Sequence, residues 1–256
     1  KNFGRVAAQL AKGVVTQRIR EAERSIIYGE YKEKEYDIIT GTVLREDKGN
    51  VFVNIGKLET AIGPNEQIPR EKYKFNEKIK LYVVEVKNTP KGAQIIVSRT
   101  HPGLVKRLFE LEVPEIYEGV VEIKSISREA GSRSKIAVIS HDENVDPMGA
   151  CVGPKGSRVQ NIVNELKGEK IDIIKWSKNP EEFIASSLSP AKVLSVTVDQ
   201  ENKSAKVVVD DNQLSLAIGK EGQNVRLAAK LTNWKIDIKS KSQAEAAQET
   251  TETIEE

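Results

Sequence analysis

Two glycine turns carry the residues whose types and spacing point most directly to chemistry. The first, Gly153-Pro154-Lys155-Gly156, opens into a helix whose apolar positions recur at i, i+3, i+4 and i+7. Glycines let a backbone approach a ligand closely and leave N–H groups exposed. The positive end of the helix dipole and the full charges of Lys155 and Arg158 add to those amides. The turn therefore suits a phosphate backbone.

The same arrangement occurs again at Gly219-Lys220-Glu221-Gly222. In both copies a helix follows at once, and the tetrapeptide Lys-Ile-Asp-Ile closes the unit, at 170–173 and at 235–238. A single Gly-x-x-Gly is weak evidence, because most such patterns are ordinary turns. Two copies in matching context predict a repeated structural unit with a repeated binding loop.

The composition describes a multidomain chain without a membrane segment. Its 256 residues, 38% hydrophobic and 30% charged, suffice for two or three small domains. No apolar run approaches the length of a membrane span, and the opening Lys-Asn-Phe-Gly-Arg is not a signal peptide. Because the chain starts without an initiator Met, we expect something to precede it. These features predict a cytoplasmic protein with no membrane contact.

Cysteine and histidine give no sign of catalysis or metal binding. Cys151 is the single cysteine, which excludes an internal disulfide and fits a reducing compartment. It lies in an apolar turn, where a small buried side chain is a simpler interpretation than a nucleophile. His101 and His141 are far apart, and no Cys/His cluster has metal spacing. We expect no cofactor, no metal and no enzymatic activity.

The net charge of +2 is lower than the charge of the chain without its acidic tail. The last 16 residues hold one Lys and five Glu, a net of −4, so residues 1–240 carry +6. That excess allows nucleic-acid binding without proving it.

The N-terminal part is predicted to be a linker helix, within residues 1–35. Residues 2–27 are amphipathic, with a stripe of Phe3, Val6, Leu10 and Val14. Two interpretations stay open. The stripe either packs on a neighbouring part of this chain or belongs to a helix that joins a preceding domain to this body.

Residues 36–100 are predicted to form a small β-barrel. Strand candidates with alternating or β-branched content lie at 37–44, 51–55, 59–62, 79–87 and 93–98. Five short strands over this length fit an OB-type barrel. The segment from Gly41 to Gly56 resembles the S1-motif RNA-binding barrel. Its aromatic candidates for base stacking are few, with Phe52 first and Tyr73, Phe75 and Tyr82 weaker, so we expect thin stacking.

The two repeat units follow at 101–177 and 178–240, each ordered helix, strand, strand, short helix, loop, helix, strand. In the first unit the strands are expected at 118–127, 135–140 and 170–175, and in the second at 192–199, 206–210 and 234–238. Residues 241–256 are rich in Gln, Ala, Thr and Glu, and we predict a disordered acidic tail there, with a short acidic helix for a partner as the alternative.

This order of elements resembles the NusA family of bacterial transcription factors. The resemblance rests on Gly-Ala-Cys-Val-Gly-Pro-Lys-Gly-Ser-Arg-Val-Gln at 149–160 and Leu-Ala-Ile-Gly-Lys-Glu-Gly-Gln-Asn-Val-Arg-Leu at 216–227, and it covers about residues 1–240. It implies an α+β multidomain fold: a linker helix, a five-stranded OB-type (S1-motif) barrel and two tandem type II KH domains. It also implies that a polymerase-binding N-terminal domain is missing here.

The resemblance further implies a function and partners. The body would bind single-stranded nascent RNA near the exit channel of RNA polymerase and would modulate pausing, intrinsic termination and, with other Nus antitermination factors, antitermination. We expect a monomer. The alternative is a KH/S1-motif accessory module of an RNA-processing or ribosome-associated factor.

KH domains clamp about four nucleotides with the Gly-x-x-Gly loop. The resemblance carries three roles over by position. The loops would hold sugar-phosphate, and the first helical turns would reach phosphates or base edges. An apolar residue before each loop would lie beneath bases. In the first domain these residues are Val152, Gly153, Pro154, Lys155, Gly156, Ser157, Arg158 and Gln160. In the second they are Ile218, Gly219, Lys220, Glu221, Gly222, Gln223, Asn224 and Arg226.

Some features of these loops limit what each one contributes. Pro154 has no N–H, and Glu221 is negative, so we expect modest positioning by each loop and affinity from the tandem through effective concentration. Ile173 and Ile238, on the closing strands, are either the far wall of the groove or core.

Two other functions compete with RNA binding. The P-loop and dinucleotide fingerprints both fail, which disfavours a nucleotide-dependent enzyme. A phosphorolytic RNA-processing enzyme can carry KH and S1-motif domains, but in the reverse order and after catalytic domains. A protein-facing scaffold remains the other alternative, and the salt dependence of RNA binding separates it from an RNA-binding body.

Overall fold

The structure, a computed structural model, describes residues 3–252, with side chains described over 4–246. The chain divides into two compact units, residues 1–107 and 108–256, and each is described by itself. Among the described residues, no helix has the length and apolarity that crossing a membrane would require.

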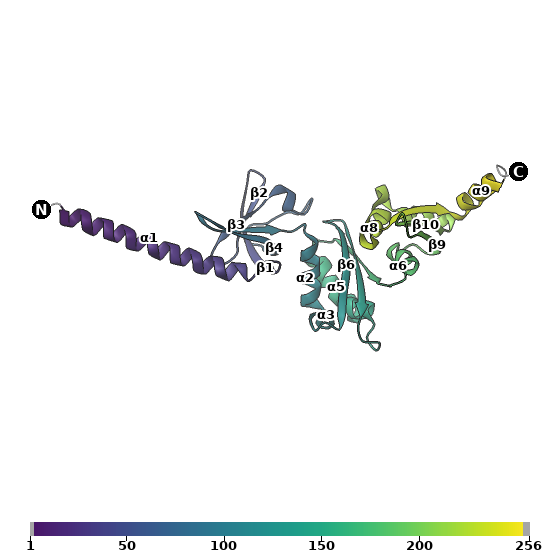
Figure 1. Cartoon of the computed structure of the whole chain (residues 1–256), viewed down its shortest axis with the longest axis horizontal. Helices are drawn as coiled ribbons and strands as arrows, with labels where there is room; N and C mark the ends of the chain where they lie inside the picture. The colour runs from purple at the N-terminus through teal and green to yellow at the C-terminus, as the bar shows by residue number, and fades with distance from the viewer. Residues whose placement is uncertain (1–2, 253–256) are drawn as a thin grey trace. The chain divides into compact units, whose positions relative to one another are not determined.

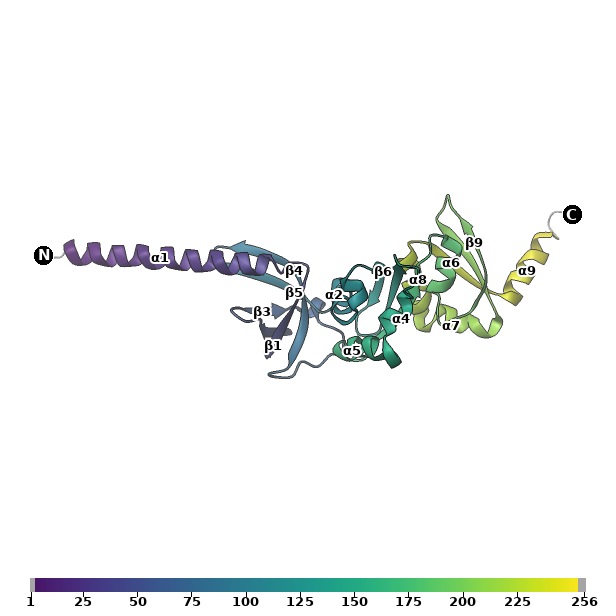
Figure 2. The same ribbon diagram turned by 90° about the horizontal axis from the view of Figure 1, so that it is seen from below.

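The first unit begins with a long helix, α1 (Phe3–Lys32), which confirms the predicted N-terminal helix and extends it at its C-terminal end. Its last turns pack on the barrel through Ile27, Tyr28 and the buried Tyr31. The Tyr31 hydroxyl donates to the carbonyl of Ile55 at 2.8 Å, which fixes the end of the helix. Within the first unit, both views show no strand of the barrel beside the N-terminal part of α1 (Figures 1 and 2).

The predicted apolar stripe of α1 is therefore not covered by its own barrel. Val6, Leu10 and Val14 are 61%, 71% and 56% exposed. Whether another part of this chain packs on the stripe stays a prediction. The alternative, a helix that joins a preceding domain, stays a prediction.

Five antiparallel strands form the predicted barrel: β1 (Ile38–Asp47), β2 (Asn50–Asn54), β3 (Glu59–Ile62), β4 (Lys78–Thr89) and β5 (Gly92–Ser98). Their order in the sheet is β3-β2-β1-β4-β5. Alternate residues point inward, as in β2, where Val51 and Val53 are fully buried. The Thr60 hydroxyl of β3 donates to the Ile95 carbonyl of β5 at 2.6 Å, so the two edges meet and the barrel is nearly closed.

A buried ion pair holds the end of the barrel. Arg99 follows β5, and its guanidinium pairs with both carboxylate oxygens of Glu71; the two side chains are 0% and 1% exposed. Arg99 also donates to the Lys80 carbonyl at 2.7 Å. Such a pair is costly to break, because removal of one partner leaves a buried charge uncompensated.

Helix α2 (Pro102–Glu112) runs from the first unit into the second, and a short helix that the sequence did not predict, α3 (Pro114–Tyr117), follows it. The first repeat then has β6 (Val121–Glu129), β7 (Arg133–Ser140), α4 (Pro147–Val152), the glycine loop, α5 (Ser157–Glu165) and β8 (Lys170–Lys175). The sheet order is β6-β7-β8, with β8 parallel to β7.

The second repeat has the same order of elements. It comprises α6 (Pro180–Ser187), β9 (Val193–Asp199), β10 (Ser204–Val209), α7 (Leu214–Ile218), the second loop, α8 (Gln223–Thr232) and β11 (Lys235–Ser240). Its sheet order is β11-β10-β9, with β11 parallel to β10. Both repeats have the element order that the resemblance implies for a KH domain, and the α+β fold predicted from the sequence is confirmed. The exact domain boundaries stay a prediction.

The acidic tail differs from expectation. A helix, α9 (Lys241–Glu252), occupies most of the segment for which the sequence predicts disorder. Its start is a capping box: the Gln243 amide donates to the Ser240 hydroxyl at 3.3 Å, and the Ser240 amide donates to the Gln243 side chain at 3.1 Å. Residues 253–256 lie outside the described residues.

Candidate nucleic-acid interface

The two predicted loops have the same backbone conformation. Gly153 and Gly219 have φ/ψ of 73°/174° and 77°/170°. The residues two positions on, Lys155 and Glu221, both have φ of 53°, with ψ of 26° and 27°. The repeat inferred from the sequence is therefore a repeat of geometry, although the side chains differ.

The first glycine of each loop is required by steric contact as well as by torsion. A Cβ at Gly153 would lie 2.5 Å from Cγ of Arg158. At Gly219 it would lie 2.8 Å from the backbone nitrogen of Asn224. The second glycines, Gly156 and Gly222, have a left-handed conformation; a Cβ at Gly156 would meet nothing within 4 Å, and one at Gly222 would make ordinary contact with Val225 at 3.9 Å.

The loop amides are less available than the sequence predicts. Gly153 donates its N–H to the Gly149 carbonyl at 2.9 Å, and Gly156 donates to Gly153 at 3.0 Å. In the second loop Gly219 donates to Ser215 at 2.9 Å, and Gly222 donates to Gly219 at 3.1 Å. The prediction that these glycines present free amides is therefore wrong. The bonded glycine amides fix the turn, and the missing side chains leave room for a ligand to approach.

The exposed cations of the loops are Lys155 and Lys220. They occupy different places, since Lys155 aligns with Glu221 and Lys220 aligns with Pro154. Within the described residues, neither ammonium has a carboxylate at ion-pair distance. Ser157 and Gln160 on α5 are also exposed, although Gln160 donates to Asn164 one turn on, at 2.9 Å. Val152 and Ile218 are half-buried beside the loops.

Arg158 and Asn224 brace the loops from behind. Arg158 donates to the Ala150 carbonyl at 2.7 Å and to the Glu115 carboxylate at 2.8 Å. Asn224 is 3% exposed and donates to the carbonyls of Ala217 and Leu188, each at 3.0 Å. Each side chain thus ties its loop to the short helix before it. A direct contact of either side chain with RNA stays a prediction.

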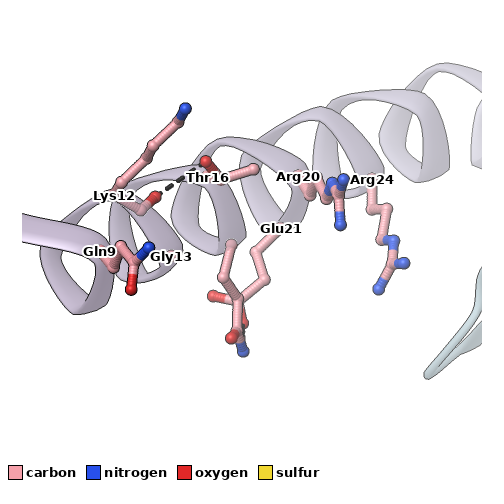
Figure 3. A pocket seen from close by; sticks show the side chains of 8 residues that line it. Gln9, Lys12, Gly13, Thr16, Arg20, Glu21 and Arg24 are labelled. Atoms are coloured by element: carbon pink, nitrogen blue, oxygen red, sulfur yellow. Dashed lines mark hydrogen bonds between the residues drawn. The ribbon is translucent and has the colours of Figure 1, made fainter. Parts of the chain in front are cut away.

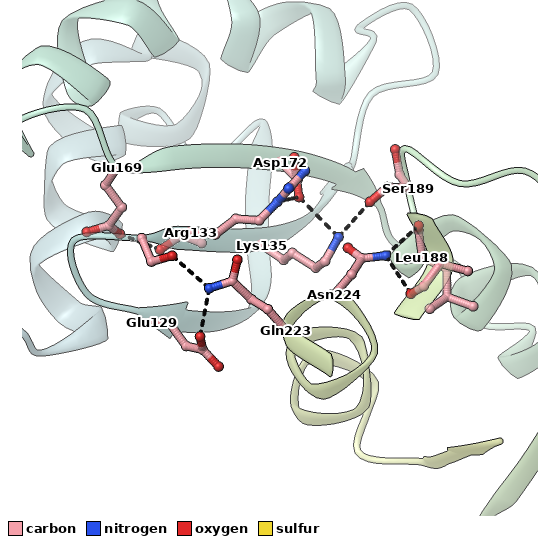
Figure 4. Close-up of polar contacts among 12 residues, drawn as sticks. Glu129, Arg133, Lys135, Glu169, Asp172, Leu188, Ser189, Gln223 and Asn224 are labelled. Atoms are coloured by element: carbon pink, nitrogen blue, oxygen red, sulfur yellow. Dashed lines mark hydrogen bonds and ion pairs between the residues drawn. The ribbon is translucent and has the colours of Figure 1, made fainter. Parts of the chain in front are cut away.

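Gln223, shown beside Glu129 in Figure 4, and Arg226 join the second loop to the first domain. Gln223 donates to Glu129 at 2.8 Å and to the Ser132 hydroxyl at 2.7 Å. Arg226 donates to the other oxygen of Glu129 at 2.6 Å. The hydrogen bond from Arg226 holds the pKa of the Glu129 carboxyl below its ordinary value. The first turn of α8 therefore grips the β6–β7 turn, and we call these four residues the interdomain clasp.

A second set of contacts docks the two KH domains. Lys135 on β7 is fully buried and donates to Asp172 at 3.1 Å and to the Ser189 carbonyl of the second domain at 2.7 Å (Figure 4). Burial lowers the pKa of the Lys135 ammonium. An apolar cluster adjoins it, made of Ala137, Ile174, Phe183 and Leu231 with Trp176 packed against them. Both domains contribute to this cluster, so the tandem is one body.

The two closing-strand isoleucines are neither fully core nor fully open. Ile238 is half-buried and packs against the core of the second domain, and Ile173 is half-buried on β8. The interpretation as groove wall stays open for both.

The four aromatic candidates of the barrel differ in how far their rings are exposed. The Arg45 guanidinium lies 4.3 Å from the Phe52 ring centroid and pairs with Glu59, so the first candidate for stacking is already covered. Tyr73 packs against the barrel core, and Tyr82 is buried. Phe75 is 79% exposed.

Other features offer less. Burial raises the pKa of the Cys151 thiol to about 12, so the thiol stays protonated at neutral pH. A shallow depression along α1 is lined by side chains of that helix alone, among them Lys12, Thr16 and Arg20 (Figure 3). No group of three or more potential metal ligands occurs in the part of the chain that the structure describes.

Comparison with protein families identifies both KH domains. Residues 99–176 match the NusA-like first KH domain, and residues 180–246 match the NusA-like second KH domain. Among solved structures, the match to the crystal structure of APE1850 covers 52% of this chain and 96% of that chain. The TM-score is 0.39 and the sequence identity is 23%, so the likeness is distant.

Curated relatives cover nearly the whole chain. The transcription termination/antitermination protein NusA of Halalkalibacterium halodurans is 62% identical over 96% of this chain and 64% of its own length. That of Bacillus subtilis is 63% identical over 95% and 66%. That of Mycobacterium tuberculosis is 50% identical over 93% and 72%. The chain therefore spans about two thirds of the length of these relatives.

Proposed function

The chain belongs to the NusA family of transcription termination/antitermination proteins, and from that premise we propose that it is the RNA-binding body of such a factor. It would bind nascent single-stranded RNA near the exit channel of RNA polymerase. There it would modulate pausing, intrinsic termination and, together with other Nus factors, antitermination. It would act in the cytoplasm, as a monomer.

The observation that carries the proposal is the pair of loops with matching torsions on one docked body. Each loop presents a lysine to solvent, Lys155 in the first and Lys220 in the second. Each has glycines that allow a sugar-phosphate chain to come close. A phosphate chain that touches both loops gains affinity through effective concentration, without a strong contact at either.

The direct test is binding of single-stranded RNA over a salt series. The variants are Lys155→Ala, Lys220→Ala and the double substitution. A matched control replaces Lys178 and Lys206, two exposed lysines of the same unit outside the loops. Each phosphate contact contributes about 0.7 to the slope of log K against log salt for a single strand, so the double variant is expected to lose about 1.4.

The outcomes separate RNA binding from a protein-facing role. The proposal is supported if the loop variants lose affinity and slope while the control binds like the parent chain. It fails if the loop variants and the control behave alike. The effect on transcription is tested by placing the loop double variant in the full-length protein. Termination efficiency at a hairpin terminator should then shift toward that of polymerase alone.

A further inference from the structure

The barrel carries a loop, residues 70–78, whose outward side is both basic and aromatic. It lies after the short turn η1 (Pro64–Glu66) and leads into β4. Its exposed residues include Arg70, Lys72, Lys74 and Lys78, and the ring of Phe75 is 79% exposed. We call residues 70–78 the basic loop. Neither KH loop is part of it, and no family match covers it.

Alternate residues anchor the basic loop to the barrel. Glu71 is buried in its ion pair with Arg99. Tyr73 packs against the barrel core, and its hydroxyl accepts the Ile68 amide at 3.2 Å. With Glu71 and Tyr73 facing inward, Lys72 and Lys74 face outward.

Backbone bonds fix the far end of the basic loop against β1. The Asn76 amide donates to the Val43 carbonyl at 2.8 Å, and the Val43 amide donates to Glu77 at 2.9 Å. The Phe75 ring therefore stands out from a backbone that is held on both sides. A fixed platform loses little conformational freedom when a ligand binds to it.

The acidic residues of the loop do not neutralise the outward cations. Glu71 is committed to Arg99, and a Glu77 carboxylate oxygen accepts the Lys74 backbone amide at 3.2 Å. In the described part of the chain, the side chains of Arg70, Lys72, Lys74 and Lys78 have no carboxylate at ion-pair distance. The basic loop therefore presents four uncompensated positive charges around one exposed ring.

We propose that the basic loop is a second contact site for single-stranded RNA, at which Phe75 stacks on a base while the lysines beside it meet phosphates. Either feature alone would be ordinary, because single exposed apolar residues and solvated lysines are common. Together on a pinned loop they supply the two things that single-strand binding uses, a positive track and a stacking platform. Lysine is depleted in the cores of protein interfaces, so this surface suits RNA better than a protein.

The basic loop lies apart from the strand face that the sequence favours for the RNA contact of the barrel. Phe52 on β2 is covered by Arg45, which is itself paired with Glu59. The open ring is the one on the loop before β4. This inference rests on the proposed RNA-binding function, and its test keeps the two apart.

The experiment uses the whole chain with two oligouridylates. One has about four nucleotides, the length that one KH loop clamps. The other has about 20, enough to reach beyond a single site. The test variants are Phe75→Ala and the triple variant Lys72→Ala/Lys74→Ala/Lys78→Ala. A matched triple variant, Lys12→Ala/Lys34→Ala/Lys91→Ala, removes the same charge from other exposed lysines of the first unit that have no carboxylate at ion-pair distance among the described residues.

For the long RNA, Phe75→Ala is expected to weaken binding by about fivefold or more, the loss of one stacked base. The test triple is expected to lower the salt slope by about 2, since three phosphate contacts contribute about 0.7 each. Ultraviolet crosslinking should attach the RNA to the peptide that contains Phe75. Because Phe75 and the lysines are exposed, thermal unfolding of the variants should match that of the parent.

The inference is overturned if Phe75→Ala and the test triple both bind the long RNA like the parent while Lys155→Ala/Lys220→Ala loses binding. The proposed function then still stands. It is also overturned if the control triple lowers the slope as much as the test triple, because the effect would then be general charge. If the parent chain binds neither RNA, the proposed function and the inference both fail.

Discussion

The two glycines of each loop differ in what a methyl group would meet, and alanine substitution should separate them by stability. The first glycine, Gly153 or Gly219, has φ near +75° with ψ near 170°. That region is almost closed to residues with a Cβ, at about 1–3 kcal/mol. The second glycine, Gly156 or Gly222, lies in the left-handed helical region, where alanine costs about 1 kcal/mol.

Steric contact widens the difference. An alanine methyl at 153 would lie 2.5 Å from the Arg158 side chain, so Arg158 must move and release bonds of about 1 kcal/mol each. At 219 the methyl would lie 2.8 Å from the Asn224 backbone nitrogen, which cannot move without α8. We therefore expect a loss of about 2–4 kcal/mol for the first glycines and about 1 kcal/mol for the second.

The assay is urea unfolding followed by tryptophan fluorescence. The chain has two tryptophans, and both lie in the KH tandem, at 176 and 234. The same variants should be tested for RNA binding, where Gly156→Ala is expected to weaken affinity while the fold remains, because its methyl fills the approach to the loop. If first- and second-glycine variants lose the same stability within each domain, the steric reasoning is refuted.

Three further outcomes follow from buried and paired groups. Glu169→Ala should cost about 3–5 kcal/mol in urea unfolding, because it removes the carboxylate with which the fully buried Arg128 pairs. Cys151 should resist a thiol reagent at pH 8 in the folded chain and react fully in denaturant, since its pKa is about 12. Because Arg226 holds the pKa of Glu129 below 4.5, Glu129 stabilises the folded chain at neutral pH, and that stability is lost as the pH falls through its folded pKa. Glu129→Gln should therefore be less stable than the parent at pH 7, and their stabilities should converge in acid.

Much of the fold is local and could be predicted from the sequence. Strand alternation in the barrel and the repeated Gly-x-x-Gly with its closing Lys-Ile-Asp-Ile specify elements within a few residues of where the structure has them. At 241–252 composition favours disorder, whereas the structure has a helix; its cap, Ser240 with Gln three residues on, is readable in the sequence.

The sequence could not predict which partners the side chains of the site bind. Arg158 and Arg226 look alike as cations on the first turn of a helix after a glycine loop. In the structure Arg158 braces its own loop, and Arg226 reaches a carboxylate 97 residues earlier in the chain. A periodic pattern says which face a residue is on. It does not say which other domain will lie against that face.

Loss of the interdomain clasp should change the binding affinity in opposite directions for long and short RNA. Glu129→Ala removes the acceptor of both Gln223 and Arg226, and it also removes a negative charge. If electrostatic attraction alone governed binding, RNA of every length would bind more tightly. If the clasp holds the two loops in one geometry, an RNA of about 20 nucleotides should bind less tightly, because the effective concentration at the second loop falls. An RNA of about four nucleotides should bind at least as well as before. Tighter binding of both RNAs would show that the loops act independently, and weaker binding of both would place Glu129 in the RNA contact itself.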